Sequence, residues 1–147
     1  MGPIEIVRAT PDQAGALTAL VHASAAYQGA YASILDGYAI TPDYVAANPA
    51  FAATGDGLLG FYALVEAELD LLFVADAAQG LGVGARLIAH MLAEARRRGL
   101  ASVRVVSHPP ALAFYLRMGA RRTGTVPARP PKVRWDRPEL RFDVPTG

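Results

Sequence analysis

The strongest chemical signal in the sequence is a glycine-rich segment, Gln79 to Gly84, between a short apolar stretch and a long amphipathic one. Its glycines, at positions 80, 82 and 84, let the backbone approach a phosphate closely because no Cβ is present. Main-chain N–H groups at the start of the following helix would point at the same phosphate along the favourable helix dipole. No acidic residue lies between Gln79 and His90. The segment is therefore predicted to bind an anion such as a diphosphate.

Two common phosphate-binding motifs do not fit these glycines. The P-loop requires Gly-Lys-Ser/Thr, and no lysine follows here. The dinucleotide fingerprint requires an acid roughly 20 residues further on, at the end of the next strand. That strand is expected at Ser102 to Val106, and Ser107 and His108 follow it without an acid. A simple turn remains an alternative interpretation of the segment.

Helix start and stop signals predict one helix directly after this segment and several others along the chain. Val83 to Arg98 carries one apolar stripe and is followed by Gly99, which predicts a helix. Thr10-Pro11-Asp12 and Thr41-Pro42-Asp43 each combine an N-cap with a following proline, which predicts helices ending near positions 22 and 48. Two more helices are expected, at residues 24–35 and 109–118.

Strands are expected between these helices wherever apolar and polar residues alternate or β-branched residues gather. Their ranges are 4–8, 50–53, 58–65, 68–75, 102–106, 121–126 and 140–144. A proline-rich loop from Pro127 to Pro138 separates the last two. This mixture of strands and helices predicts an α/β or α+β sheet covered on both faces.

Composition restricts the class of protein. With 52% apolar and 18% charged residues in 147, the chain is expected to form one globular domain spanning residues 1–147. The absence of cysteine excludes disulfides and thiolate metal sites, and no metal site is expected. Neither a signal peptide nor an apolar run of about 18 residues is recognisable, so the chain is expected to be cytoplasmic, without a membrane partner.

Charge is distributed unevenly although the net charge is only +1. Between Arg8 and Arg86 there are eight acidic residues and no Lys or Arg, whereas Ala95 to Trp135 holds ten basic residues and no acid. Such blocks suit a cationic ligand on one half and a polyanionic ligand on the other, although ordinary solvated surface is an alternative. A nucleic-acid partner is not expected, because the chain is nearly neutral and shows no recognisable reading helix.

The order of these motifs resembles the GNAT superfamily of acetyl-CoA-dependent N-acetyltransferases. Gln79-x-x-Gly82-x-Gly84 matches the Q/R-x-x-G-x-G/A pyrophosphate motif of that family. Leu71 to Val74 is similar to the family's splayed strand, and His108 to Gly119 to its following helix and turn. Ile4 to Leu20 resembles the opening strand and helix. The resemblance implies a GNAT-like, mixed and mostly antiparallel sheet flanked by helices and parted in the middle.

The resemblance also implies acetyl-CoA as co-substrate and assigns residues to it. Backbone groups of Phe73 and Val74 would pair with the pantetheine arm as an added strand. His108 stands where the family often has an asparagine, so contact with CoA, proton transfer and capping of the next helix all remain open. The diphosphate would be held by Gln79, Gly80, Leu81, Gly82, Val83 and Gly84.

Two catalytic groups follow from the resemblance. Tyr115 matches the tyrosine that protonates the departing CoA thiolate, with a core aromatic beside Phe114 as the alternative. Glu68 lies eleven residues before Gln79, where the histone-type branch carries its catalytic glutamate. Strand alternation would put Glu68 and Asp70 on one face of their strand, together with Leu72 and Val74. Glu66, Asp70 and an ordered water are the competing bases.

The acceptor is expected at Tyr27 to Tyr44, where the family places variable helices. An aromatic and acidic wall for a cationic amine would be formed by Tyr27, Tyr31, Tyr38 and Tyr44 with Asp36 and Asp43, unless these residues serve ordinary packing. The implied reaction is acetyl transfer to a primary amine of a small molecule or peptide, by direct attack in a ternary complex. A non-catalytic CoA-binding or regulatory module is the alternative, and a homodimer is compatible with the resemblance.

Overall fold

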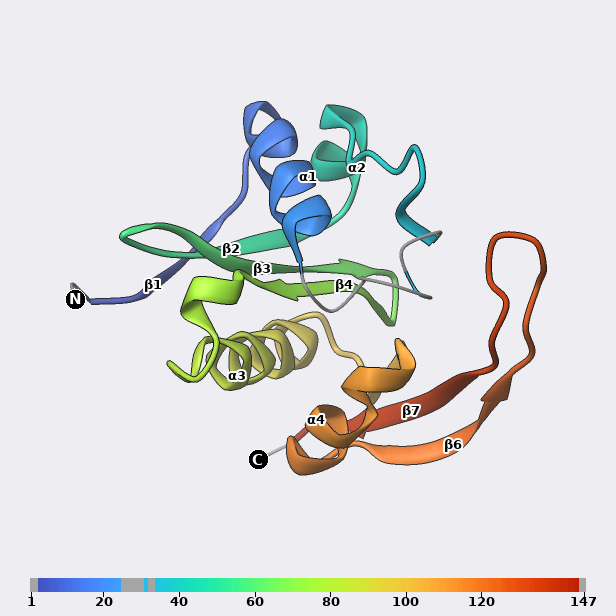
Figure 1. The fold of residues 1–147 in the computed structure, drawn as a ribbon. Coiled ribbons are helices and arrows are strands. Elements are labelled where there is room, and N and C mark those ends of the chain that lie inside the picture. The colour runs from blue at the N-terminus through green and yellow to red at the C-terminus, as the bar shows by residue number, and fades with distance from the viewer. Residues whose placement is uncertain (1–2, 25–30, 32–33, 146–147) are drawn as a thin grey trace.

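A seven-stranded sheet runs through the computed structural model, which describes residues 3–24, 31 and 34–145 (Figure 1). Its strands lie in the order β1-β2-β3-β4-β5-β7-β6. Within the described ranges β4 and β5 pair in parallel, and the other neighbours pair antiparallel. The expected mixed, mostly antiparallel sheet is confirmed. The strands are Glu5–Arg8 (β1), Ala50–Gly55 (β2), Gly57–Val65 (β3), Glu68–Val74 (β4), Ser102–Val106 (β5), Arg121–Val126 (β6) and Arg137–Asp143 (β7).

Helices flank the sheet on both sides (Figure 1). Ala14–Ala23 (α1) and Pro42–Ala47 (α2) lie on one side, here called the α1/α2 face. Val83–Arg97 (α3) and Leu112–Arg117 (α4) lie on the other, the α3/α4 face. Short 3₁₀ turns precede three of these helices, at Pro11–Gln13 (η1), Asp76–Ala78 (η4) and Pro109–Ala111 (η5). The described helices include none that is long and apolar enough to cross a membrane.

Each face of the sheet has its own apolar core. On the α3/α4 face, Leu87 and Met91 of α3 are fully buried in one cluster with Tyr62 of β3. On the α1/α2 face, Leu17 and Val21 of α1 are buried with other strand residues. Alternate residues of β3 supply the two cores, which is why this strand is almost uniformly apolar in the sequence.

The start signals of α1 and α2 have the expected structure. Thr41 has extended backbone geometry, and its hydroxyl accepts a hydrogen bond from the Tyr44 N–H at 3.1 Å. Thr10 forms the corresponding capping box with Gln13 ahead of α1. Most of the helix expected at residues 24–35 falls outside the described residues.

The last strand differs from its prediction. β7 begins at Arg137 rather than Leu140, so it includes Pro138, which was expected in a loop. A strand residue projects its N–H and C=O to the same side, and the Pro138 carbonyl accepts from the Ser107 N–H at 2.9 Å. The missing N–H of Pro138 therefore faces the chain just after β5 has ended, where no ladder donor is required.

Candidate active site

The glycine segment forms an open, amide-lined start to α3. Gly80 and Gly82 have φ angles of 81° and 78°, in the left-handed region that favours glycine. Gly82 is the N-cap residue and offers no side-chain cap. The Arg86 N–H donates to the Gly82 carbonyl at 3.1 Å, so the N–H groups of the four residues before it lie ahead of the intrahelical bonds. This geometry suits an anion.

Side chains around the segment hold it against the sheet. The Gln79 side-chain amide donates to the Val74 carbonyl at 3.1 Å and ties the loop to the end of β4. A Cβ on Gly84 would lie 3.1 Å from two ring atoms of Phe114, so this glycine also permits close packing of α3 against α4. The motif thus has a packing role that phosphate chemistry alone does not predict.

Strands β4 and β5 part soon after they meet. Their register consists of one pair, Glu68 with Arg104. Beyond that pair, β4 and β5 form no further ladder pairs along their described residues. A strand edge without a neighbour offers main-chain donors and acceptors to an extended ligand.

A cavity of about 640 Å³ occupies this gap and passes from one face of the sheet to the other. At its α3/α4 end it is lined by Gly84 and Phe114, and at its α1/α2 end by Leu35, Tyr38 and Asp70. Most of the predicted cofactor residues line it: Phe73, Val74, Gln79, Gly80, Gly82, Val83, Gly84 and His108. Leu81 lies outside the lining and is 42% exposed.

A β-bulge in β4 overturns the predicted alternation of its side chains. Ala63 pairs with Leu71 while the next residue of β3, Leu64, pairs with Leu69, so Asp70 is an extra residue in β4. The bulge reverses the parity: Leu69 shares the α3/α4 core with Leu72 and Val74. The expectation that Asp70 shares a face with those two residues was wrong.

Asp70 is instead held from the α1/α2 face. The Tyr44 hydroxyl of α2 donates to its Oδ2 at 2.5 Å. Burial, and then this hydrogen bond, raise the pKa of Tyr44 well above its ordinary value. Burial, and then the charge of Asp70, raise the pKa of Tyr38 to about 12. Both phenols therefore remain protonated next to a carboxylate at neutral pH.

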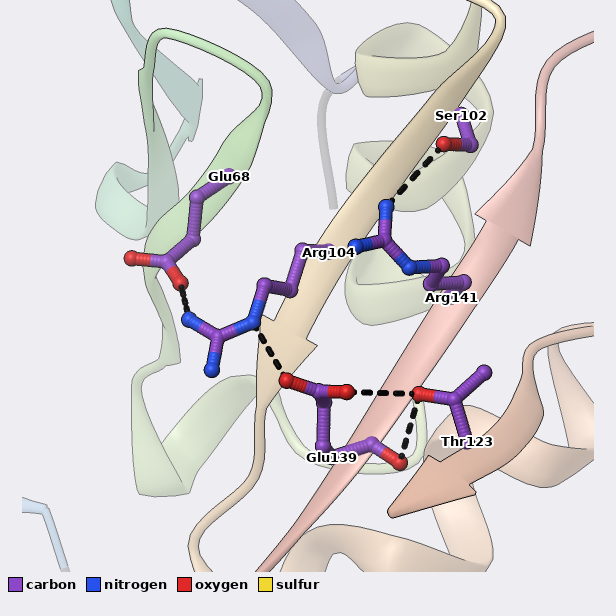
Figure 2. A network of polar contacts seen from close by, with 6 residues as sticks. All are labelled: Glu68, Ser102, Arg104, Thr123, Glu139 and Arg141. Atoms are coloured by element: carbon purple, nitrogen blue, oxygen red, sulfur yellow. Dashed lines mark hydrogen bonds and ion pairs between the residues drawn. The ribbon is translucent and has the colours of Figure 1, made fainter. Parts of the chain in front are cut away.

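Glu68 lies outside the lining of the large cavity. Its carboxylate accepts from Arg104 Nη1 at 2.5 Å, and the same guanidinium donates through Nε to Glu139 at 2.6 Å (Figure 2). Hydrogen bonds from Arg104 and then Thr123 lower the pKa of Glu139. The network crosses β4, β5, β7 and β6 beside the point where β4 and β5 part (Figure 2).

Tyr115 lines the cavity from α4 and is 7% exposed. Its ring lies in edge contacts with Phe114 and Phe142, at centroid distances of 5.4 and 6.3 Å. Tyr115 thus belongs to the α3/α4 core and still borders the cavity, a position that both predictions for it require.

Three aromatic rings meet at one end of the cavity. His108, which is buried, and Trp135 both belong to the lining. Tyr31 packs edge-on against them, at 4.5 Å from His108 and 4.7 Å from Trp135. Of the four tyrosines predicted at the acceptor site, Tyr38 lines the cavity, Tyr31 contacts two lining rings, and Tyr44 donates to the lining residue Asp70. Tyr27 lies outside the described residues.

A second cavity of about 330 Å³ adjoins the first. The two share the residues Leu69, Asp70, Val106 and Arg137. The second is otherwise lined by Glu68, Arg104, Val126 and Arg129. Sequence inspection missed Arg137, because its strand was expected to begin three residues later.

Comparison with known proteins agrees with this geometry. The model of a family described as an acetyltransferase (GNAT) domain matches residues 46–129, which include the glycine segment and α4. No curated protein sequence gives a significant match.

The fold is similar to those of several solved structures. A GCN5-related N-acetyltransferase from Rhodopseudomonas palustris is 22% identical, with a TM-score of 0.76 and 97% of each chain covered. YncA of Salmonella typhimurium, solved with its cofactor acetyl-CoA, is 20% identical, with a TM-score of 0.75 over 97% of this chain and 95% of that one. The ribosomal-protein-S18-alanine N-acetyltransferase of Escherichia coli is 17% identical, with a TM-score of 0.72 over 99% and 96%. These likenesses confirm the expected fold.

Proposed function

This chain belongs to the GNAT family of acetyltransferases, and from that premise we propose that it is an N-acetyltransferase. It passes the acetyl group of acetyl-CoA to a primary amine of a small molecule or peptide. The observation that carries the proposal is the cavity through the parted strands, because it joins the amide-lined start of α3 to the acidic Asp70 on the opposite face. Donor and acceptor can thus meet from the two sides of one sheet.

Acetyl-CoA is the acetyl donor, and the residues of the α3/α4 face fit it. The N–H groups at the start of α3 suit its diphosphate. The edge of β4 from which β5 has parted suits its pantetheine arm, which would add to the sheet through main-chain hydrogen bonds. YncA, which has a similar fold, was solved with acetyl-CoA.

The transfer takes place by direct attack. The amine nitrogen adds to the thioester carbonyl carbon, a C–N bond forms, and the C–S bond breaks. A main-chain N–H near Phe73 stabilises the oxyanion. Tyr115, at the cavity wall, donates a proton to the CoA thiolate, and this proton is later replaced from water.

Asp70 fits the role of proton acceptor better than Glu68. An ammonium must lose a proton before it attacks, either directly to the acceptor or through one water. Asp70 lines the large cavity, whereas Glu68 is engaged by Arg104 beside the second one. The bulge that turns Asp70 toward α2 is the reason for this difference.

His108 serves as part of the cavity wall in this scheme. Its ring is held edge-on by Tyr31 and lies 6.5 Å from Trp135 between ring centroids. Of these rings, His108 and Trp135 line the cavity, and Trp135 belongs to the loop between β6 and β7. Packing of this kind restricts water around a thioester without any proton transfer by the imidazole.

Two measurements on the purified chain test the function. Titration calorimetry should give saturable heat with acetyl-CoA, and release of the CoA thiol should depend on an added amine. Absence of heat would remove the assignment of the donor. Binding without thiol release on any panel of amino acids, polyamines, aminoglycosides and peptide N-termini would instead support the non-catalytic module. Light scattering tests the homodimer, which remains a prediction.

A further inference from the structure

Not all of the charged side chains around the second cavity form an ion pair with a described residue. Arg104 is neutralised from both sides by Glu68 and Glu139 (Figure 2). Arg129 and Arg137 form no ion pair with any described residue. The cavity therefore keeps two unpaired guanidinium groups in addition to the Asp70 carboxylate.

Arg137 is the better placed of the two arginines. It lies at the boundary shared by both cavities, and its Nε is buried without a hydrogen-bond partner among the described residues. A buried donor of a charged group that lacks a partner is costly, so such donors normally have one in the functional complex. Arg129 is exposed at the outer rim of the second cavity.

Asp70 and Arg137 line the same two cavities from strands on opposite sides of β5. Val106 of β5 pairs with Glu139 of β7, so Arg137 lies just beyond the end of β5. Asp70 lies on β4, beyond its last pairing with β5. Two regular strand spacings amount to roughly 10 Å, and the parting of β4 from β5 widens this separation, so that the long arginine side chain spans only part of it. The remaining space suits a small molecule with charges of both signs.

We propose that the acceptor is an amine that also carries a carboxylate, such as a free amino acid. This rests on the proposed function and specifies its substrate class. The ammonium lies at Asp70, facing the thioester, and the carboxylate binds the guanidinium fork of Arg137. Transfer of one ammonium proton to Asp70, directly or through one water, leaves the neutral amine to attack the thioester, and the products are an N-acetylated carboxylate and CoA.

The chemistry of the site separates this acceptor from simpler amines. Polyamines and other purely cationic amines would leave Arg137 unpaired and add repulsion from Arg129. A carboxylate on the fork of Arg137 gains paired, charge-assisted hydrogen bonds. Preference for the carboxylate form over its uncharged amide should be roughly 10- to 100-fold in kcat/KM.

The test compares three forms of the same acceptors by thiol release from acetyl-CoA. These are each common amino acid, its amide and its decarboxylated amine. We expect the acid form of the best acceptor to be preferred, and Arg137→Gln to abolish this preference, measured as the ratio of kcat/KM for the acid to kcat/KM for its amide. Arg137→Lys should recover part of the preference, because it keeps the charge without the fork.

Arg141→Gln is the matched control. Arg141 lies on the same strand and the same face of the sheet as Arg137 but lines neither cavity. This variant should keep the full preference for the acid.

Calorimetry separates the possible failures. If acetyl-CoA gives no heat, the proposed function itself fails. If acetyl-CoA binds and the amide or amine serves as well as the acid, only the acceptor assignment is overturned. A loss of CoA affinity in Arg137→Gln would assign Arg137 to CoA and would also overturn it. If no free amine reacts, N-acetyl amino acids and their amides are titrated separately into the CoA-bound protein. Equal affinity for the acid and the amide, or no binding of either, would overturn the proposal.

Discussion

The two sides of the parted sheet present different kinds of chemical group to the cavity. On the α3/α4 face the site consists of backbone amides, glycines and apolar rings, all within residues 71–118. On the α1/α2 face it consists of charged and phenolic side chains from β4, β7, α2 and the chain before α2. The first side suits acetyl-CoA, and the second suits a particular acceptor.

This difference shows where specificity can change. Main-chain amides are independent of side-chain identity, so the donor side tolerates substitution wherever the backbone keeps its shape. The acceptor side depends on individual groups such as Asp70 and Arg137, and one substitution there changes the charge of the site. Variants on the two sides should therefore alter different kinetic constants.

Replacement of Tyr115 by phenylalanine should have the largest effect. The change removes the proposed proton donor and keeps the ring in its contacts with Phe114 and Phe142. We expect kcat to fall by about 100-fold or more, the usual contribution of a general acid, with CoA affinity unchanged. Steady-state kinetics and calorimetry measure the two quantities. An unchanged kcat would refute the role and leave Tyr115 as a packing residue.

The Gly60→Ala substitution should be the most damaging to stability. A Cβ at Gly60 would lie 2.7 Å from the Phe73 carbonyl oxygen and 3.3 Å from Leu87, so the end of β4 must move. We expect a loss of about 2 kcal/mol in the free energy of unfolding, measured with urea, and weaker CoA binding.

Gly15→Ala is the control for that comparison. Gly15 is exposed in α1, and a Cβ there would meet nothing within 4 Å. This variant should gain about 0.5 to 1 kcal/mol, because alanine favours the helix. Equal stability of the two variants would contradict the close contact at β4.

Gly82→Ala tests whether the donor side depends on backbone shape. The new Cβ would meet no atom within 4 Å, so its effect comes from the φ of 78°. Alanine in that conformation costs about 1 to 2 kcal/mol and should displace the amides that bind the diphosphate. Affinity for CoA should fall while KM for the acceptor stays constant. If only the KM for the acceptor changed, the assignment of the donor to the α3/α4 face and the acceptor to the α1/α2 face would be wrong.

The acceptor side should contribute a smaller, pH-dependent effect. Burial and Asp70 raise the pKa of Tyr38 from 10.0 to about 12, so the folded chain binds a proton there that the unfolded chain loses above pH 10. The contribution of Tyr38 to the free energy of unfolding is therefore fully present below pH 10, and it is lost as the pH rises to about 12. Urea unfolding across that range of pH should show that the free energy of unfolding decreases less steeply in Tyr38→Phe than in the unchanged protein. An identical pH dependence of the two proteins would exclude Tyr38 as a source.

Most of the elements could be predicted from local patterns. The ranges of β1, β5 and β6 and the long helix α3 follow from periodicity and from terminal signals such as Gly99. The start of β7 could not, because proline in a strand is acceptable only when its missing N–H faces no partner. That condition depends on where β5 ends, far away in the sequence.

The donor side of the site was likewise open to prediction, and the acceptor side was not. Gln79 to Gly84 is contiguous, and its conformation follows from its own glycines and the next helix. The direction of Asp70 depends on a bulge against β3, which no alternation rule within β4 indicates. The position of Arg137 depends on the pairing of β7 with two strands.

The sequence alone thus determined the family resemblance, the helix that presents free amides and the strand beside it, because local conformational preferences fix short segments. The tertiary structure decided which charged groups share a cavity: Glu68 is neutralised by Arg104, while Asp70 and Arg137 border the same space. The physical reason is that electrostatic interactions depend on distance in space, and strand pairing brings together residues from β4 and β7 that are remote along the chain.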